Sequence, residues 1–244
     1  MPLLEVSRLT KAYGGLVAVN DASFSVQSGS ITALIGPNGA GKTTAFDLIS
    51  GIVEPQNGGV SFDGTEIAGW SPHSVTRLGI GRTFQITREL GDLTVLENMV
   101  VPSATGGLRR LFSRRITADE RKRALDLLAF VGIDHLSEQR AKSLSYGQRK
   151  LLELASVLMA TPRLVLLDEP AGGVNPALLE RIMDRIRALN AQGTTFLIVE
   201  HNMDVVMQLS HSVIVMAHGE VILQGSPGLV QADHRVLDAY LGTA

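Results

Sequence analysis

The feature that most constrains this chain is a glycine-rich loop, GPNGAGKT at residues 36–43, which matches the pattern GxxxxGK[ST]. It follows the apolar segment Ile31–Ile35, which is typical of a strand, and precedes TTAFDLIS, where Ala45, Leu48 and Ile49 keep helical spacing. Strand, loop and helix in this order are the context that a phosphate-binding loop requires, because backbone N–H groups then surround phosphate oxygens at the positive end of a helix. An incidental glycine-rich turn is the alternative, and the flanking elements count against it.

The residues of this loop have separate expected roles. Lys42 would neutralise the β- and γ-phosphates of a nucleotide, and the hydroxyl of Thr43 would join the shell of a Mg²⁺ ion. The loop thus predicts a nucleoside triphosphate and Mg²⁺ as ligands, and the family resemblance described below implies that the nucleotide is ATP. The residues of this segment that we expect to bind the nucleotide are Gly36, Asn38, Gly39, Gly41, Lys42, Thr43 and Thr44.

Strand patterns occur on both sides of this loop. Residues 4–26 carry the alternating stretches LEVSRL and ASFSV around the turn-rich KAYGG, which predicts an antiparallel opening, and a second short strand pair is expected at Gly59–Asp63. Apolar strands recur further along the chain, at Leu164–Leu167, Thr195–Val199 and Val213–Met216.

A helix separates the first two of these later strands. Asn175 is its expected N-cap, Pro176 is its first residue, and its apolar stripe consists of Leu179, Ile182, Ile186 and Leu189. Strands that alternate with helices predict a mostly parallel sheet with covered faces. The expected fold class is therefore α/β, with an N-terminal antiparallel β subdomain beside a mostly parallel sheet.

The chain changes to helical periodicity between about Ile86 and Ala160. One expected apolar face holds Ala124, Leu127, Leu128 and Val131, and another holds Leu151, Leu154, Ala155 and Leu158. We expect an inserted α-helical subdomain at residues 86–160 within a single domain of residues 1–244. Residues 1–85 and 161–244 would then form the nucleotide-binding core with a C-terminal extension.

Two adjacent carboxylates, Asp168 and Glu169, end the buried strand pattern LVLL. Because adjacent residues of a strand face opposite ways, we expect different roles for them. Asp168 would hold Mg²⁺ through its water, and Glu169 would polarise the water that attacks the γ-phosphate. By itself an Asp-Glu pair at a strand end is more often a turn, and the upstream phosphate-binding loop favours the functional interpretation.

The segment LSYGQ at residues 144–148 opens a helical stretch, with Ser145 as a suitable N-cap. Alone it indicates a capped helix. Together with the glycine-rich loop and the acidic pair, it makes the chain resemble the ATP-binding-cassette ATPases over nearly its whole length. The signature loop of that family is commonly LSGGQ, and here Tyr146 replaces one glycine. The resemblance implies a P-loop NTPase core of the RecA-like type and nucleotide binding by Ser145, Gly147 and Gln148.

The resemblance also gives roles to three residues that their surroundings alone would not single out. Tyr13 stands where the family places an aromatic ring that stacks on adenine, although a strand-edge tyrosine is the plainer interpretation. Gln85, in RTFQ, matches a glutamine that reaches Mg²⁺ and the attacking water, and His201 matches a switch histidine that contacts the γ-phosphate. The implied catalytic residues are Glu169, His201 and Gln85, and the implied Mg²⁺ ligands are Thr43, Gln85 and Asp168.

In the resembled family the signature loop lies too far from the P-loop of its own chain to reach the same ATP. The resemblance therefore implies a head-to-tail pair with a second ATPase subunit, either the same chain or a sister chain. Asn175, in AGGVNP, stands where the family often has Asp, a change that keeps the helix cap and bears on coupling between paired sites.

Composition limits the partners. The 22 basic and 24 acidic residues give a formal net charge of −2, so no global field indicates nucleic-acid binding. The absence of cysteine excludes disulfides, thiolate catalysis and zinc–cysteine sites.

A basic run is better explained as a solvated loop and helix start than as a lipid or nucleic-acid patch, because it is interleaved with one aromatic residue only, Phe112. The run consists of Arg109, Arg110, Arg114, Arg115, Arg121, Lys122 and Arg123.

No apolar stretch approaches the roughly 18 residues of a membrane span, and the N-terminus lacks the pattern of a secretory signal, so we expect a cytosolic chain. A soluble repair or translation ATPase is the alternative to a transport role. Against it, the segment from Gln85 to Leu144 is too short for the long coiled coil of repair members, and the chain holds one phosphate-binding loop rather than two.

The segments RTFQ, LTVLENM, DEPAGGVNP, VEHNMDVVM and AYLG are similar to those of ATPase subunits of bacterial importers for branched-chain amino acids and related solutes. This resemblance implies integral membrane permease subunits that dock near Ile86–Met99. It also implies a periplasmic solute-binding protein as an indirect partner, and a peripheral location at the cytoplasmic face of the inner membrane.

Overall fold

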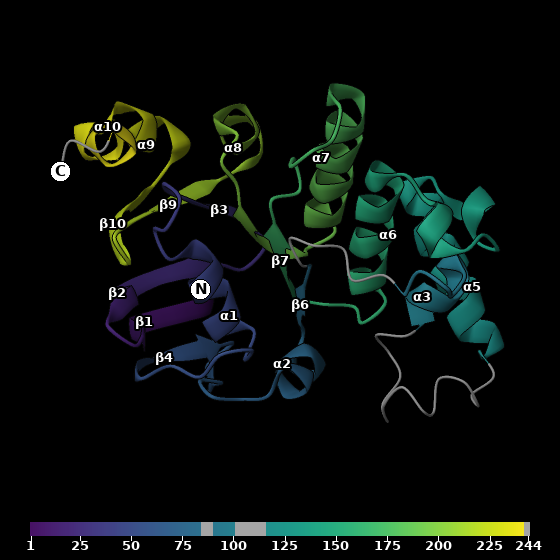
Figure 1. The fold of residues 1–244 in the computed structure, drawn as a ribbon, viewed down its shortest axis with the longest axis horizontal. Coiled ribbons are helices and arrows are strands. Elements are labelled where there is room, and N and C mark those ends of the chain that lie inside the picture. Colours follow the sequence, from purple (N-terminus) through teal and green to yellow (C-terminus); the bar gives the residue numbers. More distant parts are fainter. Residues whose placement is uncertain (84–89, 101–115, 242–244) are drawn as a thin grey trace.

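The computed structural model describes residues 1–83, 90–100 and 116–241. Two sheets organise these residues, and helices lie beside and between them (Figure 1). The α/β class with an N-terminal antiparallel sheet and a mostly parallel sheet is confirmed.

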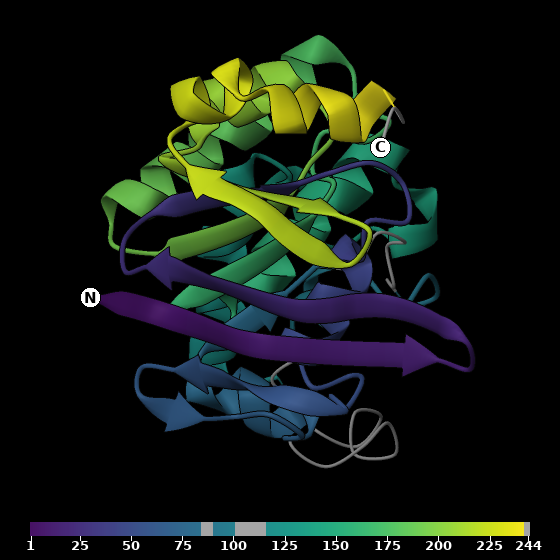
Figure 2. The ribbon, with the colours of Figure 1, turned by 90° about the vertical axis from the view of Figure 1, so that its left-hand side faces the viewer.

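The N-terminal sheet has four antiparallel strands in the order β2-β1-β4-β5 (Figure 2). Its strands are β1 (Pro2–Tyr13), β2 (Leu16–Gln27), β4 (Asn57–Phe62) and β5 (Thr65–Glu66). The first two are longer than their alternating stretches because the pairing continues through irregularities in register. Arg8 and Asp21, with φ of 48° each, interrupt the alternation there, as residues at β-bulges do.

The second sheet has six strands in the order β10-β9-β3-β8-β7-β6, and only β10 is antiparallel to its neighbour. The predicted strands are present as β3 (Ile31–Ile35), β7 (Leu164–Asp168), β8 (Thr195–Val199) and β9 (Ser212–Ala217). The edge strands β6 (Ile80–Arg82) and β10 (Glu220–Gly225) were not predicted. β6 has three residues, which is too few for an alternation pattern to show.

Both faces of this sheet are buried, as the apolar strand patterns predict. One face packs against α1 (Lys42–Ile49) and the N-terminal sheet. The other face packs against α6 (Tyr146–Leu158) and α7 (Pro176–Ala191), and against α8 (Met203–Leu209), α9 (Pro227–Ala232) and α10 (His234–Leu241). Helices α3 (Val95–Val100) and α5 (Ala118–Val131) pack in turn on α6, and α5 also contacts α7. The remaining helix, α2 (Pro72–Leu78), leads into β6.

The region predicted to be helical contains α3, α5 and α6 within the ranges that the structure describes. Capping boxes begin α5 and α6: Thr117 exchanges hydrogen bonds with Glu120, and Ser145 with Gln148. These helices share one hydrophobic core with α7, β7 and β8. The division at residues 86 and 160 therefore stays a prediction. Among the described residues, no helix is long and apolar enough to cross a membrane.

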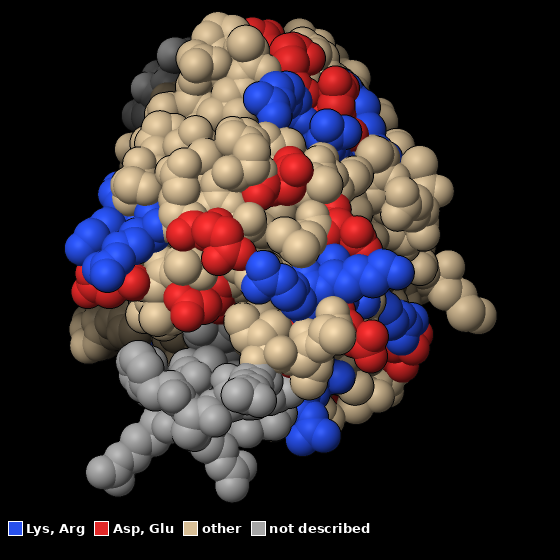
Figure 3. Space-filling model, turned by 90° about the vertical axis from the view of Figure 1, so that its right-hand side faces the viewer, with Lys and Arg blue, Asp and Glu red and all other residues tan. Residues whose placement is uncertain are grey.

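Charged side chains of both signs are mixed on the face that carries this helical region (Figure 3). Arg121, in α5, forms an exposed ion pair with Glu138 at 2.8 Å. Arg123 donates to the carbonyl of Leu158 at 3.1 Å. Arg121 and Arg123 of the basic run thus bind groups of their own chain, while Arg109, Arg110, Arg114 and Arg115 lie outside the described residues.

Asn175 caps α7 as predicted: its Oδ1 accepts a hydrogen bond from the backbone N–H of Leu178 at 2.9 Å. We expect Asn175→Ala to lower the free energy of unfolding by about 1 kcal/mol, because this N–H loses its acceptor. Asn175→Asp keeps an acceptor and should stay within about 0.5 kcal/mol of the original chain. Urea denaturation measures both variants, and equal losses in the two would contradict the capping role.

Candidate nucleotide-binding site

The glycine-rich loop connects β3 directly to α1, and Lys42 is the first residue of that helix. Two of its glycines allow contacts that a side chain would prevent. At Gly36, with φ of 149°, a Cβ atom would lie 2.1 Å from the carbonyl oxygen of Met216. At Gly41, with φ of 98°, it would lie 2.3 Å from the carbonyl oxygen of Ala18. The backbone of the loop therefore packs closely against β9 and β2. This packing fixes the positions of its backbone N–H groups, which are the groups that would bind phosphate oxygens.

Lys42 turns its ammonium group back over the loop. Its Nζ donates to the carbonyl oxygens of Gly36 at 2.7 Å and of Pro37 at 2.9 Å. Burial lowers the pKa of Lys42, and the carboxylates of Glu169 and Asp168 act in the opposite direction. A half-buried cation therefore sits at the loop with two carboxylates near it. Asn38, Gly39 and Thr43 are exposed, and Thr44 is partly buried.

The other predicted chemistry-bearing residues reach the same edge of the parallel sheet. β3, β7 and β8 are parallel, so their carboxyl ends lie together, which is where open α/β sheets bind ligands. Asp168 ends β7, and Glu169 follows it. His201 follows β8 closely, and its Nδ1 lies 3.7 Å from Oε1 of Glu169. The structure thus brings together Lys42, Asp168, Glu169 and His201.

Asp168 and Glu169 have different environments, as predicted, but for another reason than strand alternation. Asp168 is buried, with 3% of its side chain exposed, whereas Glu169 is 29% exposed. Glu169 lies beyond the last residue of β7 and adopts a left-handed backbone with φ of 47°. The change of direction after Asp168, rather than the pleat, aims the second carboxylate toward His201. Non-glycine residues with such a backbone are concentrated at functional sites.

Burial raises the pKa of Asp168, while the guanidinium of Arg82 acts to lower it. Arg82 lies at the end of β6, and its Nη2 is 3.8 Å from Oδ2 of Asp168. Its Nη1 donates to Oδ1 of Asp47 and to Oγ of Ser50, each at 2.7 Å. This buried arginine joins α1 to β7 behind the site. Sequence analysis missed it because its three partners are distant along the chain.

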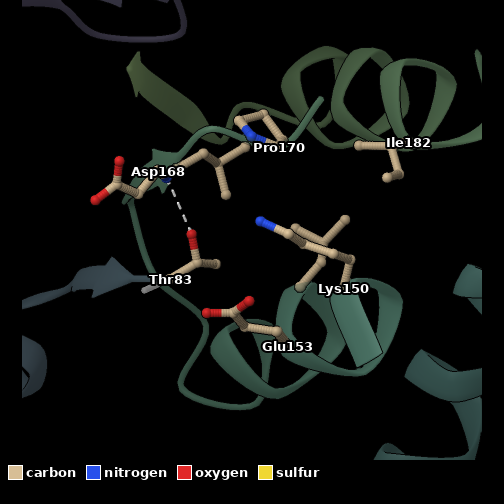
Figure 4. Close-up of a pocket in the computed structure, with 8 residues that line it drawn as sticks. Thr83, Lys150, Glu153, Asp168, Pro170 and Ile182 are labelled. Atoms are coloured by element: carbon tan, nitrogen blue, oxygen red, sulfur yellow. Dashed lines mark hydrogen bonds between the residues drawn. The ribbon is translucent and has the colours of Figure 1, made fainter. Parts of the chain in front are cut away.

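A small pocket that Asp168 helps to line lies between α6 and the end of β7 (Figure 4). Thr83 accepts from the backbone N–H of Asp168 through Oγ1 at 3.2 Å, and Glu153 lines the pocket beside it. The buried Lys150 of α6 donates from Nζ to the backbone oxygen of Glu169 at 3.2 Å. Helix α6 is thereby attached directly to the backbone of the expected base, a link that the sequence did not indicate.

The segment LSYGQ packs against the chain that follows Glu169. A Cβ at Gly147 would lie 2.2 Å from Cδ2 of Leu178, and one at Gly173 would lie 3.0 Å from the ring of Tyr146. Gln148 accepts from the backbone N–H of Ser145 through Oε1 at 2.8 Å, so its side chain completes the cap of α6. α6 lies on the far side of β6 and β7 from α1 (Figure 1). Helix α6, which Ser145 caps, and helix α1, which begins at Lys42 of the glycine-rich loop, therefore belong to cores on opposite faces of the sheet.

Two further residues, Tyr13 and Gln85, were expected to take part in the site. Tyr13 ends β1 and is 47% exposed, with Nζ of Lys11 at 5.6 Å from the centre of its ring. The strand that follows it, β2, contacts the loop through Ala18. Gln85 lies outside the described residues.

A glycine-rich loop between a strand and a helix, with an acidic strand end beside it on a parallel sheet, defines a P-loop nucleotide-binding protein. The family described as ABC transporter matches residues 19–172 of this chain. The chain belongs to the ABC transporter family, and it is an ATPase of that family.

The similarity to known relatives and to solved structures extends over nearly the whole chain. A probable branched-chain amino acid transport ATP-binding protein, LivG of Archaeoglobus fulgidus, is 40% identical over 247 residues, which cover 99% of this chain and 96% of the relative. A solved ATP-binding cassette of an ABC transporter in its ADP conformation is 34% identical, with a TM-score of 0.90 and 99% of each chain covered. A dimeric bacterial ABC transporter cassette is 25% identical, with a TM-score of 0.81, 92% of this chain covered and 98% of that chain.

Proposed function

We propose that this ATPase binds ATP with its phosphates in the loop at 36–43 and hydrolyses it with Glu169 as general base. The observation that carries the proposal is the position of Glu169, 3.7 Å from His201 and close enough to Lys42 to act on its pKa. Lys42 balances phosphate charge, Glu169 accepts a proton from the attacking water, and His201 contacts the γ-phosphate.

Mg²⁺ belongs in this proposal because the donors fit it. Thr43 offers a hydroxyl and Asp168 a carboxylate, which are hard oxygen donors of the kind that Mg²⁺ takes beside substrate phosphates and water. Bound there, the ion would supply positive charge to the β- and γ-phosphates. Burial raises the pKa of Asp168 by disfavouring its charged form, and a bound cation would offset this effect.

We infer further that two ATPase subunits pair head to tail. The placement of α6 and α1 in cores on opposite faces of the sheet supports this, because a partner's loop can face the N-terminus of the 13-residue helix α6. That terminus would direct Ser145, Gly147 and the helix dipole at the γ-phosphate bound by the other subunit. One of the similar solved structures is a dimeric cassette, which supports the pairing of two ATPase subunits.

We propose that hydrolysis drives import of branched-chain or related hydrophobic amino acids through membrane permease subunits. The name of the archaeal relative, a probable branched-chain amino acid transport ATP-binding protein, supports this step. Selectivity would then reside in the permeases and a periplasmic binding protein, with this subunit peripheral on the cytoplasmic face. The full-length similarity to a transport ATP-binding protein does not favour the alternative, a soluble ATPase outside transport.

Residues 90–99 are the described part of the expected permease contact. Glu97 there accepts from the backbone N–H of Thr94 at 2.7 Å, and Thr94 accepts in return from the N–H of Glu97 at 3.1 Å. Glu97 therefore completes a capping box at the start of α3, and its carboxylate is also exposed. Leu93, whose side chain is partly exposed, is the better position for a change that separates transport from ATP binding.

Uptake of labelled leucine, isoleucine and valine tests the transport proposal. We expect deletion of the gene to abolish uptake of at least one of them, and the original chain, but not Glu169→Gln, to restore it. Unchanged uptake of all three, in cells without a redundant system, would refute the proposed solutes. Failure to co-purify with any integral membrane protein would favour the soluble alternative.

A further inference from the structure

Glu200 is a buried carboxylate at the end of β8, next to His201 in the sequence. Only 1% of the residue is exposed. Its Oε1 accepts from the backbone N–H of Ala171 at 2.8 Å. Its Oε2 accepts from the backbone N–H groups of His201 at 3.0 Å and of Asn202 at 3.2 Å. Each carboxylate oxygen thus holds a different segment of the chain.

The two segments are those that carry the proposed base and the proposed γ-phosphate contact. Ala171 lies two residues after Glu169, in a turn that the N–H of Gly172 closes on the carbonyl of Glu169 at 3.0 Å. On the other side, Asn202 caps α8 by accepting from the N–H groups of Asp204 and Val205. One buried side chain therefore fixes the turn after β7 relative to the turn after β8.

Burying a carboxylate costs free energy that a neutral side chain would not cost, and hydrogen bonds to backbone N–H groups offset this cost. An apolar residue of similar size would fill the same space with less desolvation. What it would lack is a pair of acceptors on one rigid group, which is the property that the two turns use.

We propose that Glu200 is a positioning residue for ATP hydrolysis, which holds Glu169 and His201 in the relative arrangement that the 3.7 Å contact records. The inference rests on the proposed roles of those two residues. Glu200 acts through the backbone of Ala171 and of His201 rather than by direct contact with nucleotide or with the attacking water.

The test compares Glu200→Gln in the full chain with a matched control on the same strand. Glutamine keeps the size but has one oxygen, so one of the two turns meets an amide donor in place of an acceptor. Thr195→Val is the control, because the buried Thr195 at the start of β8 likewise accepts from a backbone N–H, that of Gly29 at 2.9 Å. It removes a buried acceptor at the end of the strand away from the site.

We expect Glu200→Gln to lower kcat for ATP by about tenfold to a hundredfold, with KM changed by less than about threefold, because misplaced groups reduce turnover more than binding. Thr195→Val should leave kcat within about twofold of the original chain. If Glu200→Gln folds poorly, Glu200→Asp supplies the same test, since it keeps the charge but cannot reach both turns.

A double-mutant cycle with His201→Ala distinguishes positioning from a general loss of stability. If Glu200 acts by holding His201 and Glu169 relative to each other, it has no pair to hold once the His201 imidazole is absent, so the double variant should be little slower than His201→Ala alone. Multiplied effects, or a kcat of Glu200→Gln within about twofold of the original, would overturn the inference. Glu169→Gln is measured in parallel: if it stays active, the proposed function itself fails, and if it is inactive, the cycle reports on Glu200 alone.

Discussion

Replacing Lys42 with alanine is expected to weaken ATP binding by about a hundredfold or more and to remove turnover with it. A charged hydrogen bond to phosphate contributes about 1.5–3 kcal/mol, and Lys42 is expected to reach both the β- and γ-phosphates. The variant also loses the two hydrogen bonds from Nζ to the carbonyls of Gly36 and Pro37, which tie the first turn of the loop to α1. Isothermal titration with ATP and a phosphate-release assay measure the two effects.

Lys142→Ala is the matched control for this change. Lys142 also forms a short ionic contact, with Oδ1 of Asp92 at 2.8 Å, but both side chains are largely exposed. Exposed pairs contribute about 0–1 kcal/mol, so its loss should leave ATP binding unchanged. Hydrolysis by Lys42→Ala at a rate near that of the control would show that the loop at 36–43 does not bind the transferred phosphate.

The parts of the site that local pattern specifies could be predicted from the sequence. The run from Ile31 to Ile49 contains its own strand, turn and helix signals, and the structure places β3 and α1 where they were expected. The caps at Ser145 and Asn175 are also local, because each N-cap bonds a backbone N–H three residues later.

The parts that depend on distant partners could not be predicted. Arg82 is defined by its contacts with Asp47, Ser50 and Asp168, which lie in α1, at its C-terminal cap and in β7, all distant from Arg82 along the chain. Glu200 ends an apolar strand in a carboxylate, as Asp168 does, and this shared pattern is the one signal that could have found it. Even so, its hydrogen bond to Ala171 depends on the neighbouring position of β7 and β8 in the sheet.

The direction of the Glu169 side chain is another feature that local sequence pattern does not specify. Strand alternation predicted that it would differ from Asp168, and it does, but its left-handed backbone is what sets its direction. Its backbone N–H donates to the carbonyl of Val199 at 3.0 Å, and its carbonyl accepts from Lys150 and Gly172. These three contacts, from β8, α6 and the following turn, hold the strained conformation.

Glu169→Gln is expected to separate ATP binding from hydrolysis. The amide keeps the shape of the side chain and can stay near His201, so ATP should bind with its affinity changed by less than about threefold. It cannot accept a proton from water, and loss of a general base lowers turnover by about 10²–10⁴-fold. Glu180→Gln, on the exposed surface of α7, is the control for the change in charge and should hydrolyse ATP at the original rate.

The same variant tests the proposed pairing of subunits, because a chain that binds but does not hydrolyse ATP should accumulate in the ATP-bound state. If ATP joins the loop at 36–43 of one chain to Ser145 and Gly147 of another, two copies bury the nucleotide between them and hydrolysis would separate them. Light scattering should then show the mass of Glu169→Gln double on addition of ATP but not of ADP. No change in mass would argue against a homodimer and direct the search to a sister subunit, whereas turnover near the original rate would show that Glu169 is not the base.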